Sequence, residues 1–146
     1  MDEVKDRKNI ALIFRINNAL TKQKNKKMAR YDLTSIQADV LIYILLNADK
    51  GEINQLDIQA VFKLTNPTVS GIIDRLAEKN FIKRAKSVKD ARFRRLLPMP
   101  KGEALLDVLL KSAHNAEEEF LVDMTNEEKD EFERLLNIAL KTVESD

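Results

Sequence analysis

The chain has no cysteine among its 146 residues and only three glycines and three prolines. Without cysteine there is neither a disulfide framework nor a thiol that could act as a redox switch. The small number of helix-breaking residues, together with a charged fraction of 34%, favours a mainly α-helical protein. The length suits one compact domain or one subunit of a dimer.

Long apolar runs are also missing, and no stretch is long enough to cross a bilayer. The charged start at residues 1–5 lacks the pattern of a signal peptide. We therefore expect a cytoplasmic protein that makes no contact with a membrane.

Motifs of catalysis are absent as well. The single histidine, His114, has no second imidazole and no cysteine to complete a zinc site. Glu117 and Glu118 follow it at three and four residues, which favours an ion pair on a helix surface. There is no phosphate-binding glycine loop, nucleophile elbow or dinucleotide fingerprint. We expect no enzymatic activity, no metal site and no cofactor.

Charge is present in quantity but is unevenly distributed, although the net charge is only +1. Residues 83–102 contain eight basic side chains and one acidic side chain. Residues 103–146 contain four basic and thirteen acidic ones. The local basic excess indicates an anionic partner for the first of these segments, whatever the overall sum.

Two short helices joined by a tight turn are predicted from about residue 55 to residue 79. Asn54 is a strong N-cap residue, so the first helix should begin near Gln55. Its apolar residues have the spacing of one buried helical face: Leu56, Ala60 and Val61.

The second predicted helix has one apolar side and one polar side. Asn66 can cap it, and Pro67 suits the first helical position. Four apolar residues form the buried stripe: Val69, Ile72, Ile73 and Leu76. The remaining sides carry small or polar residues: Thr68, Ser70, Gly71, Asp74, Arg75 and Glu78.

The polar side has two interpretations. It can be an ordinary solvated helix surface. It can also be the face of a helix that enters the major groove of DNA, where Gly71 would let the backbone approach closely. In the second interpretation five residues contact bases and phosphates: Asn66, Thr68, Ser70, Gly71 and Arg75.

A basic β-hairpin is predicted directly after this helix. Asn80 tolerates the left-handed conformation that ends a helix, and a β-branched, alternating stretch follows it. Seven cations lie between residues 83 and 95: Lys83, Arg84, Lys86, Lys89, Arg92, Arg94 and Arg95. Most charge runs are solvated loops, but cations beside a groove-binding helix would meet phosphates or the minor groove.

Asp90 is the only acid within this hairpin, and it lies two residues before Arg92. Its carboxylate could hold the guanidinium extended, so that less rotamer entropy is lost when DNA binds. We predict that Arg92 reaches the minor groove with the help of Asp90. Three further cations should contact phosphates: Lys86, Lys89 and Arg94.

Helices at both ends carry more apolar surface than one subunit can bury. The first has a broad apolar face: Ile10, Ile13, Phe14, Ile16 and Leu20. A stripe over residues 103–121 would be about 28 Å long at 1.5 Å per residue. A last helix should follow the capping-box residues Thr125 and Glu128.

A two-fold homodimer through these terminal helices would bury their apolar faces. It would place two DNA-binding units about 34 Å apart, one turn of DNA, and so predicts an inverted-repeat site. Within the single subunit of residues 1–146, we assign residues 33–100 to the DNA-binding unit and residues 1–30 and 101–146 to the dimerisation helices.

The order and spacing of several short motifs resemble those of the MarR (multiple antibiotic resistance regulator) family, and the resemblance covers essentially the whole chain. The motifs are Thr68-Val69-Ser70, Asp74-Arg75-Leu76, Phe81-Ile82-Lys83-Arg84, Asp90-Ala91-Arg92 and Lys101-Gly102, preceded by Leu33-Thr34-Ser35-Ile36-Gln37. The resemblance implies a mainly α, winged helix-turn-helix fold with a small β-hairpin wing and terminal dimerisation helices.

Three positions depart from the family pattern. Pro98 and Met99 stand where leucine and threonine are common, so the usual hydroxyl cap of the next helix is missing. Ala91 replaces a common arginine of the wing. These departures bear on the geometry of the wing more than on the fold.

The resemblance also implies a function, namely a transcriptional regulator that binds double-stranded DNA as a homodimer. Most such regulators are repressors, and many are relieved by a small ligand that binds near the dimerisation helices. Phe14, Arg15 and Tyr43 could line such a site. The alternative roles are core packing for Phe14 and Tyr43 and a surface ion pair for Arg15.

A winged-helix protein-interaction module without DNA binding remains the alternative function. It would keep the same apolar stripes but would lack the steep salt dependence that phosphate contacts produce.

Overall fold

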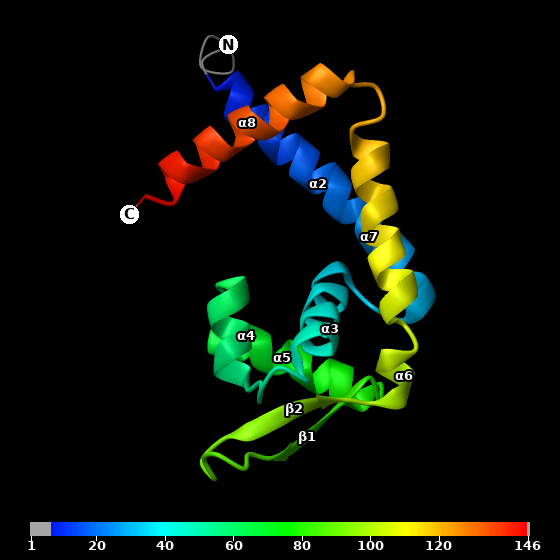
Figure 1. Cartoon of the computed structure of the whole chain (residues 1–146), viewed down its shortest axis with the longest axis vertical. Coiled ribbons are helices and arrows are strands. Elements are labelled where there is room, and N and C mark those ends of the chain that lie inside the picture. Colours follow the sequence, from blue (N-terminus) through cyan, green and yellow to red (C-terminus); the bar gives the residue numbers. More distant parts are fainter. Residues whose placement is uncertain (1–6, 146) are drawn as a thin grey trace. The chain divides into compact units, whose positions relative to one another are not determined.

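The computed structural model describes residues 7–145, so the charged start at residues 1–5 lies outside the described residues. The elements are α2 (Lys8–Met28), η1 (Ala29–Tyr31), α3 (Ser35–Asn47), α4 (Gln55–Phe62), α5 (Asn66–Glu78), β1 (Ile82–Lys86), β2 (Arg94–Pro98), α6 (Pro100–Glu103), α7 (Leu106–Phe120) and α8 (Asn126–Val143) (Figure 1). The predicted class, mainly α with one hairpin, is confirmed. None of the described helices has the length and apolarity needed to span a membrane.

The chain forms two compact units, residues 1–106 and residues 107–146. The core of the first unit is built around α3. A capping box begins this helix as predicted, because Thr34 accepts a hydrogen bond from the Gln37 amide and the Gln37 side chain accepts one from the Thr34 amide. Val40, Leu41 and Ile44 are completely buried.

Helix α4 starts where its cap predicts but buries a different face. The Asn54 and Asp57 side chains accept each other's backbone N–H groups, which confirms the start at Gln55. The predicted buried face is wrong: Leu56 and Val61 are 53% and 50% exposed, and Ala60 is exposed as well.

The reason lies in the geometry of a short helix that packs on one side. Ile58, two residues from both Leu56 and Ala60, points to nearly the opposite side of the helix at about 100° per residue. Ile58 is completely buried, and Phe62 one turn later makes an edge contact with Tyr43 at 6.0 Å between ring centroids. This i, i+4 pair forms the inner stripe of α4.

Helix α5 confirms the predicted stripe, since Val69, Ile72, Ile73 and Leu76 are all buried. Its N-cap, however, is Thr65 and not Asn66, and Pro67 takes the second helical position. The Asn66 side chain is engaged elsewhere, because its oxygen accepts a hydrogen bond from Gln55 Nε2 at 2.5 Å. This bond ties the start of α5 to the start of α4.

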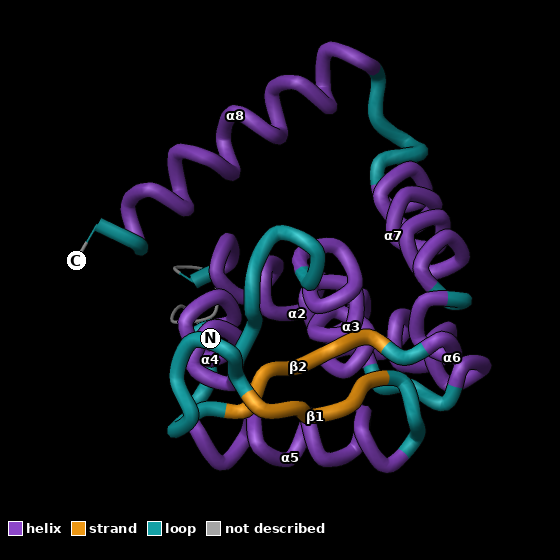
Figure 2. Tube along the Cα trace, turned by 60° about the horizontal axis from the view of Figure 1, so that its bottom comes forward, coloured by secondary structure: helices purple, strands orange, loops and turns teal. Residues whose placement is uncertain are grey.

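The hairpin follows a left-handed residue, Asn80, with φ of 64°, as predicted. Strands β1 and β2 pair antiparallel, with Ile82 opposite Pro98 and Lys86 opposite Arg94. Phe81, Ile82 and Leu96 are buried at the base of the hairpin, which runs alongside α5 (Figure 2). The hairpin is therefore held against the helix by apolar packing.

The predicted continuous helix over residues 103–121 is wrong, because the structure breaks it at Ala104 and Leu105. The four residues of α6 are held in place by the chain before β1. The Met99 amide donates to the Phe81 carbonyl at 3.0 Å, and Gly102 packs so tightly there that an added Cβ would lie 2.3 Å from the same oxygen. As expected, no side chain caps α6.

The second unit consists of most of α7 and all of α8, joined by a short turn. Thr125 and Glu128 form the predicted capping box of α8, and Phe120 contacts Phe132 edge-on at 6.0 Å. His114 Nε2 lies 3.2 Å from Glu118 Oε1, which confirms the predicted pair on a helix surface.

Both terminal helices expose apolar residues in the single chain. On α2 these are Ile10, Leu12, Ile13, Phe14 and Ile16, and on α8 they are Leu135, Leu136, Ile138, Leu140 and Val143. The C-terminal part of α2 is attached to α3 by the Lys24–Asp39 ion pair and by the Ser35 amide, which donates to Asn25 Oδ1 at 2.7 Å. The exposed apolar faces lie outside these attachments.

The close contact at Gly102 leads to a stability prediction. Gly102→Ala should lower the free energy of unfolding by about 1–3 kcal/mol, because the methyl group has no space beside the Phe81 carbonyl. Gly71→Ala is the matched control, since nothing lies within 4 Å of its added Cβ. It should raise the free energy of unfolding by about 0.5–1 kcal/mol. Urea denaturation measures both, and equal effects of the two substitutions would contradict the assignment.

Candidate nucleic-acid interface

The outer side of α5 presents a short polar surface near its N-terminus. Thr68, Gly71 and Arg75 are exposed, whereas Ser70 is half-buried. The Thr68 hydroxyl accepts a hydrogen bond from the Thr65 hydroxyl at 3.0 Å, which leaves its own proton available to a partner. Nothing in the chain crowds Gly71. This surface can approach a flat or grooved partner closely.

Besides Thr68, two of the five residues predicted on α5 have side-chain partners within the protein. Asn66 accepts from Gln55, as described, but its amide nitrogen has donors to spare. Arg75 lies 3.8 Å from Glu78, and both side chains are about two-thirds exposed. An exposed ion pair of this length contributes little and leaves the guanidinium available to another anion.

The seven cations of the hairpin divide into two groups. Two of them bind acids outside the hairpin: Arg84 forms an ion pair with Asp74 of α5, and Arg95 lies 3.6 Å from Glu52 in the loop before α4. Both arginine side chains are less than a third exposed. These two residues fasten the hairpin to the helix-turn-helix.

Lys86 and Arg94 belong to the second group, which faces solvent. They are directly opposite each other on β1 and β2, and both are exposed. Among the described residues, neither side chain has a hydrogen-bond or ion-pair partner. Like charges opposite each other destabilise a sheet, so the pair favours an anion that lies across both strands.

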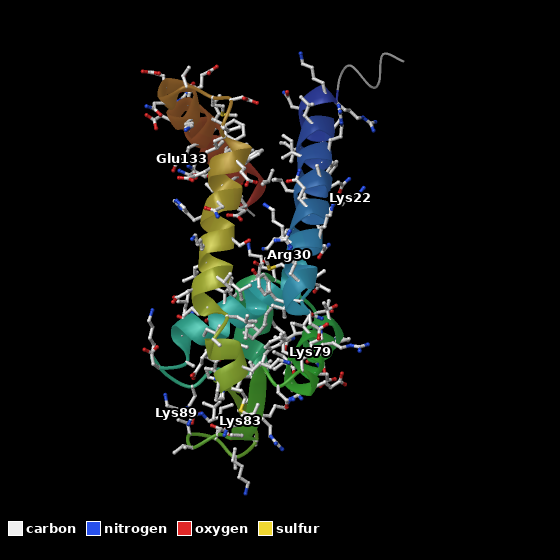
Figure 3. The ribbon with its side chains drawn as sticks, turned by 90° about the vertical axis from the view of Figure 1, so that its right-hand side faces the viewer. Lys22, Arg30, Lys79, Lys83, Lys89 and Glu133 are labelled. Carbon is white, nitrogen blue, oxygen red and sulfur yellow. The ribbon has the colours of Figure 1, made fainter. Side chains whose placement is uncertain are left out.

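Lys83 and Lys89 extend the exposed basic surface of the hairpin (Figure 3). Lys83 lies on β1 and Lys89 in the loop that joins the two strands. The cations that face solvent therefore follow the hairpin from its base to its tip.

Asp90 and Arg92 form the predicted pair at the hairpin tip. Asp90 Oδ2 accepts from Arg92 Nη2 at 2.7 Å, and Asp90 Oδ1 accepts from Arg92 Nε at 3.1 Å and from the Arg92 amide at 3.0 Å. These hydrogen bonds lower the pKa of Asp90 and raise the pKa of Arg92, so both groups stay charged. The arginine side chain is 84% exposed and held in one direction.

No sequence pattern indicates Glu52, the acid that holds the other end of the hairpin loop. Its carboxylate accepts from the Ser87 hydroxyl at 2.6 Å and from the Val88 amide at 2.8 Å. These bonds, with the nearby charges of Arg95 and Lys89, lower the pKa of Glu52. Because 35 residues separate Glu52 from Ser87, no local pattern could have revealed the contact.

In the sequence Lys101 stands out only as part of the Lys101-Gly102 motif, whereas in the structure it makes two contacts with the segment between α5 and β1. Its Nζ donates to the Lys79 carbonyl at 2.8 Å and lies 4.7 Å from the centroid of the Phe81 ring. Together with Gly102, it fastens α6 to the segment between α5 and β1. Lys101 therefore stabilises the segment that leads into the hairpin.

Among the described residues, no hydrogen bond, ion pair or ring contact joins any two of the three residues considered for a ligand site. Phe14 is 63% exposed on α2, so core packing within the subunit is wrong for this residue. Arg15 is exposed on the same helix, and Tyr43 is half-buried against Phe62. No ring contact joins Phe14 and Tyr43 among the described residues. The core-packing prediction fails for Phe14 because no other described part of the first unit covers this position of α2.

Residues 40–93 match the model of the MarR family. The match begins inside α3, includes α4, α5 and β1, and ends one residue before β2. Over these residues the chain is similar to the winged helix of the MarR family. By position, α5 corresponds to the recognition helix of a winged helix and the β1–β2 hairpin to its wing, which we define as residues 82–98.

Several solved structures share this fold over most of the chain. A complex of MepR from S. aureus with DNA is 22% identical, with 92% of this chain and 96% of that chain covered and a TM-score of 0.84. A MarR variant from E. coli in complex with operator DNA is 20% identical, with coverages of 94% and 96% and a TM-score of 0.81. The transcriptional regulator SlyA is 22% identical, with coverages of 92% and 92% and a TM-score of 0.80.

At these identities the structural likeness establishes the fold. No curated protein sequence matches the chain.

The opposed cations of the wing give a second prediction. Lys86→Glu places an acid opposite Arg94 and should raise the free energy of unfolding by roughly a few tenths of a kcal/mol at low salt. Lys83→Glu is the matched control, because its cross-strand neighbour is Leu97 and no such gain is expected. Thermal unfolding at two salt concentrations measures both variants. If Lys86→Glu is destabilised at low salt, the two cations do not repel each other.

Proposed function

We propose that the protein is a transcriptional regulator that binds double-stranded DNA as a homodimer, most simply a repressor that blocks access to a promoter. One observation carries the proposal. The exposed polar face of α5 adjoins a wing on which Lys86 and Arg94 face each other without a described partner and Arg92 is held outward by Asp90. Such a surface is suited to a polyanion that has grooves.

The recognition helix supplies the part that reads sequence. A B-DNA major groove admits an α-helix, and each base pair shows a distinct pattern of donors and acceptors there. Thr68 and Ser70 can donate or accept, and Arg75 can form a bidentate contact with guanine. Gly71 allows the helix backbone to come close, since no side chain separates it from the groove floor.

The wing supplies the part that follows the DNA backbone. An arginine held outward by a carboxylate suits a narrow minor groove, where the negative potential is strongest. Lys86, Lys89 and Arg94 suit phosphate contacts on either side. Arg84 and Arg95 are not part of this set, because Asp74 and Glu52 bind them.

The fold relatives support the proposal by analogy. One of them, MepR, was solved in complex with DNA, and the MarR variant was solved with operator DNA. A protein with the same fold and a comparable surface is reasonably proposed to bind the same class of partner. The proposal also keeps the cytoplasmic location expected from the sequence.

The exposed apolar faces of α2 and α8 support the homodimer. Single exposed apolar residues are normal on a protein surface, but contiguous rows along two helices indicate an interface. A two-fold dimer presents two recognition helices about 34 Å apart, which matches an inverted-repeat operator. The proposal keeps a small ligand that relieves repression, with Phe14, Arg15 and Tyr43 as its contact residues, as the resemblance implies.

Selection of bound fragments from the source genome tests the proposed function, followed by a salt titration on the enriched duplex. The proposal expects an enriched palindrome and an affinity that falls with a log–log slope of about −0.9 for each phosphate contact. An absence of enrichment together with a flat salt dependence would favour the protein-interaction module instead.

Arg92→Ala gives a third prediction. The variant should bind the enriched duplex about 1–3 kcal/mol more weakly, because it loses a groove contact. Arg134→Ala is the matched control, since this arginine lies on α8 in an exposed pair with Glu131 and should not affect DNA affinity. Fluorescence anisotropy measures both. Equal affinity of Arg92→Ala and the unaltered protein would exclude the role of Arg92.

The dimer gives a fourth prediction. Leu136 and Leu140 lie one turn apart on α8 and are 44% and 49% exposed in the single chain. Replacing both with Glu should convert the dimer to a monomer, because charges at an apolar interface lose their hydration. Val88→Glu, at an 84% exposed position of the wing loop, should leave the dimer intact. Sedimentation equilibrium measures all three proteins, and a dimeric double variant would place the interface elsewhere.

A further inference from the structure

The loop before α4 and the tip of the wing are joined by one carboxylate. Glu52 Oε2 accepts from the Ser87 hydroxyl at 2.6 Å, and Glu52 Oε1 accepts from the Val88 amide at 2.8 Å. Arg95 Nη1 lies 3.6 Å from the same Oε1. Both carboxylate oxygens are therefore used, and all these partners belong to the wing.

The hydrogen bonds continue from Ser87 to Arg92. The Ser87 oxygen accepts from the Lys89 and Asp90 amides, each at 3.1 Å. The Asp90 carboxylate then accepts from the amide and the guanidinium of Arg92. A continuous series of bonds thus runs from Glu52 through Ser87 and Asp90 to the exposed guanidinium.

The charge of Glu52 makes this arrangement informative. An acid near a DNA-binding wing should repel phosphates, so simple electrostatics gives no reason for one at this position. The Glu52 side chain is only 16% exposed, and such a carboxylate needs several donors to offset its lost hydration. The wing loop supplies these donors and is fixed by them in return.

We propose that Glu52 is a positioning residue for DNA binding, which holds the wing loop so that Asp90 presents Arg92 in its binding direction. The physical effect is preorganisation: a loop and a long side chain that are already ordered lose less entropy when DNA binds. Glu52 itself does not touch DNA. This inference rests on the proposed function, and it adds a residue that the recognition helix and the wing do not contain.

The sign of one substitution separates positioning from plain electrostatics. Removing an acid near DNA should strengthen binding if charge alone matters. If Glu52 positions the wing, Glu52→Ala should weaken binding by about five- to tenfold, as expected for one loop segment and one side chain that must be ordered. Glu78→Ala is the matched control, because it removes an exposed acid beside the recognition helix and should not weaken binding.

A double-substitution cycle tests whether the effect passes through Arg92. The unaltered protein, Glu52→Ala, Arg92→Ala and the double variant are titrated against the enriched duplex by fluorescence anisotropy. Most of the loss caused by Glu52→Ala should disappear in the Arg92→Ala background, since the residue to be positioned is gone. Ser87→Ala, which removes the next group in the series, should weaken binding in the same direction as Glu52→Ala.

The free protein offers a second readout that does not involve DNA. The NMR order parameter of Arg92 Nε should fall in Glu52→Ala relative to the unaltered protein and remain unchanged in Glu78→Ala. If Glu52→Ala is too unstable to study, Glu52→Gln serves both experiments. It keeps the size of the side chain and one acceptor oxygen but loses the charge and the second acceptor.

The outcomes distinguish this inference from the proposed function. If the unaltered protein binds no duplex, the proposed function fails, and the order parameter then shows by itself whether Glu52 orders Arg92. If the unaltered protein binds but Glu52→Ala binds equally well or more tightly, the positioning role is overturned. A Glu52→Ala loss that persists fully in the Arg92→Ala background would also overturn it, because Glu52 would then act on something other than Arg92.

Discussion

The arrangement of α5 and the wing depends on the apolar packing at the base of the wing. Phe81, Ile82 and Leu96 are buried where the hairpin meets α5 and α3, and Gly102 allows α6 to close over the Phe81 carbonyl. A two-stranded hairpin has little stability of its own. This packing gives the wing a fixed direction relative to α5, so the two can act on one partner together.

Electrostatics then assigns different roles to side chains of the same charge. In the sequence the seven cations of the wing form one basic run, but Arg84 and Arg95 bind Asp74 and Glu52 and fix the wing to the helix-turn-helix. Lys86 and Arg94 lie opposite each other on the two strands, and a bound anion would reduce the repulsion between their charges. The net charge of the chain is only +1 because the acidic excess of residues 103–146 offsets the basic excess of the wing.

Features that depend on neighbours within about four residues could be predicted from the sequence. The Asn54 cap, the buried stripe of α5, the turn at Asn80 and the Asp90–Arg92 pair are of this kind. Features that depend on distant contacts could not. Ile58 faces inward, and not Leu56, because of what packs on α4. Helix α6 is held by a contact between Met99 and the distant Phe81 carbonyl, and Glu52 binds Ser87, which is 35 residues away in the sequence. The contacts that each residue makes with DNA depend on the bound duplex as well as on the protein, so neither the sequence nor the fold alone determines them.

Backbone amide chemical shifts followed during a titration with duplex DNA show whether α5 and the wing bind DNA as one surface. We expect the large shift changes to fall both in residues 66–75 and in residues 86–94, to saturate at the same DNA concentration, and to spare the exposed side of α8. Shifts confined to one of the two segments, or centred on α8, would contradict it.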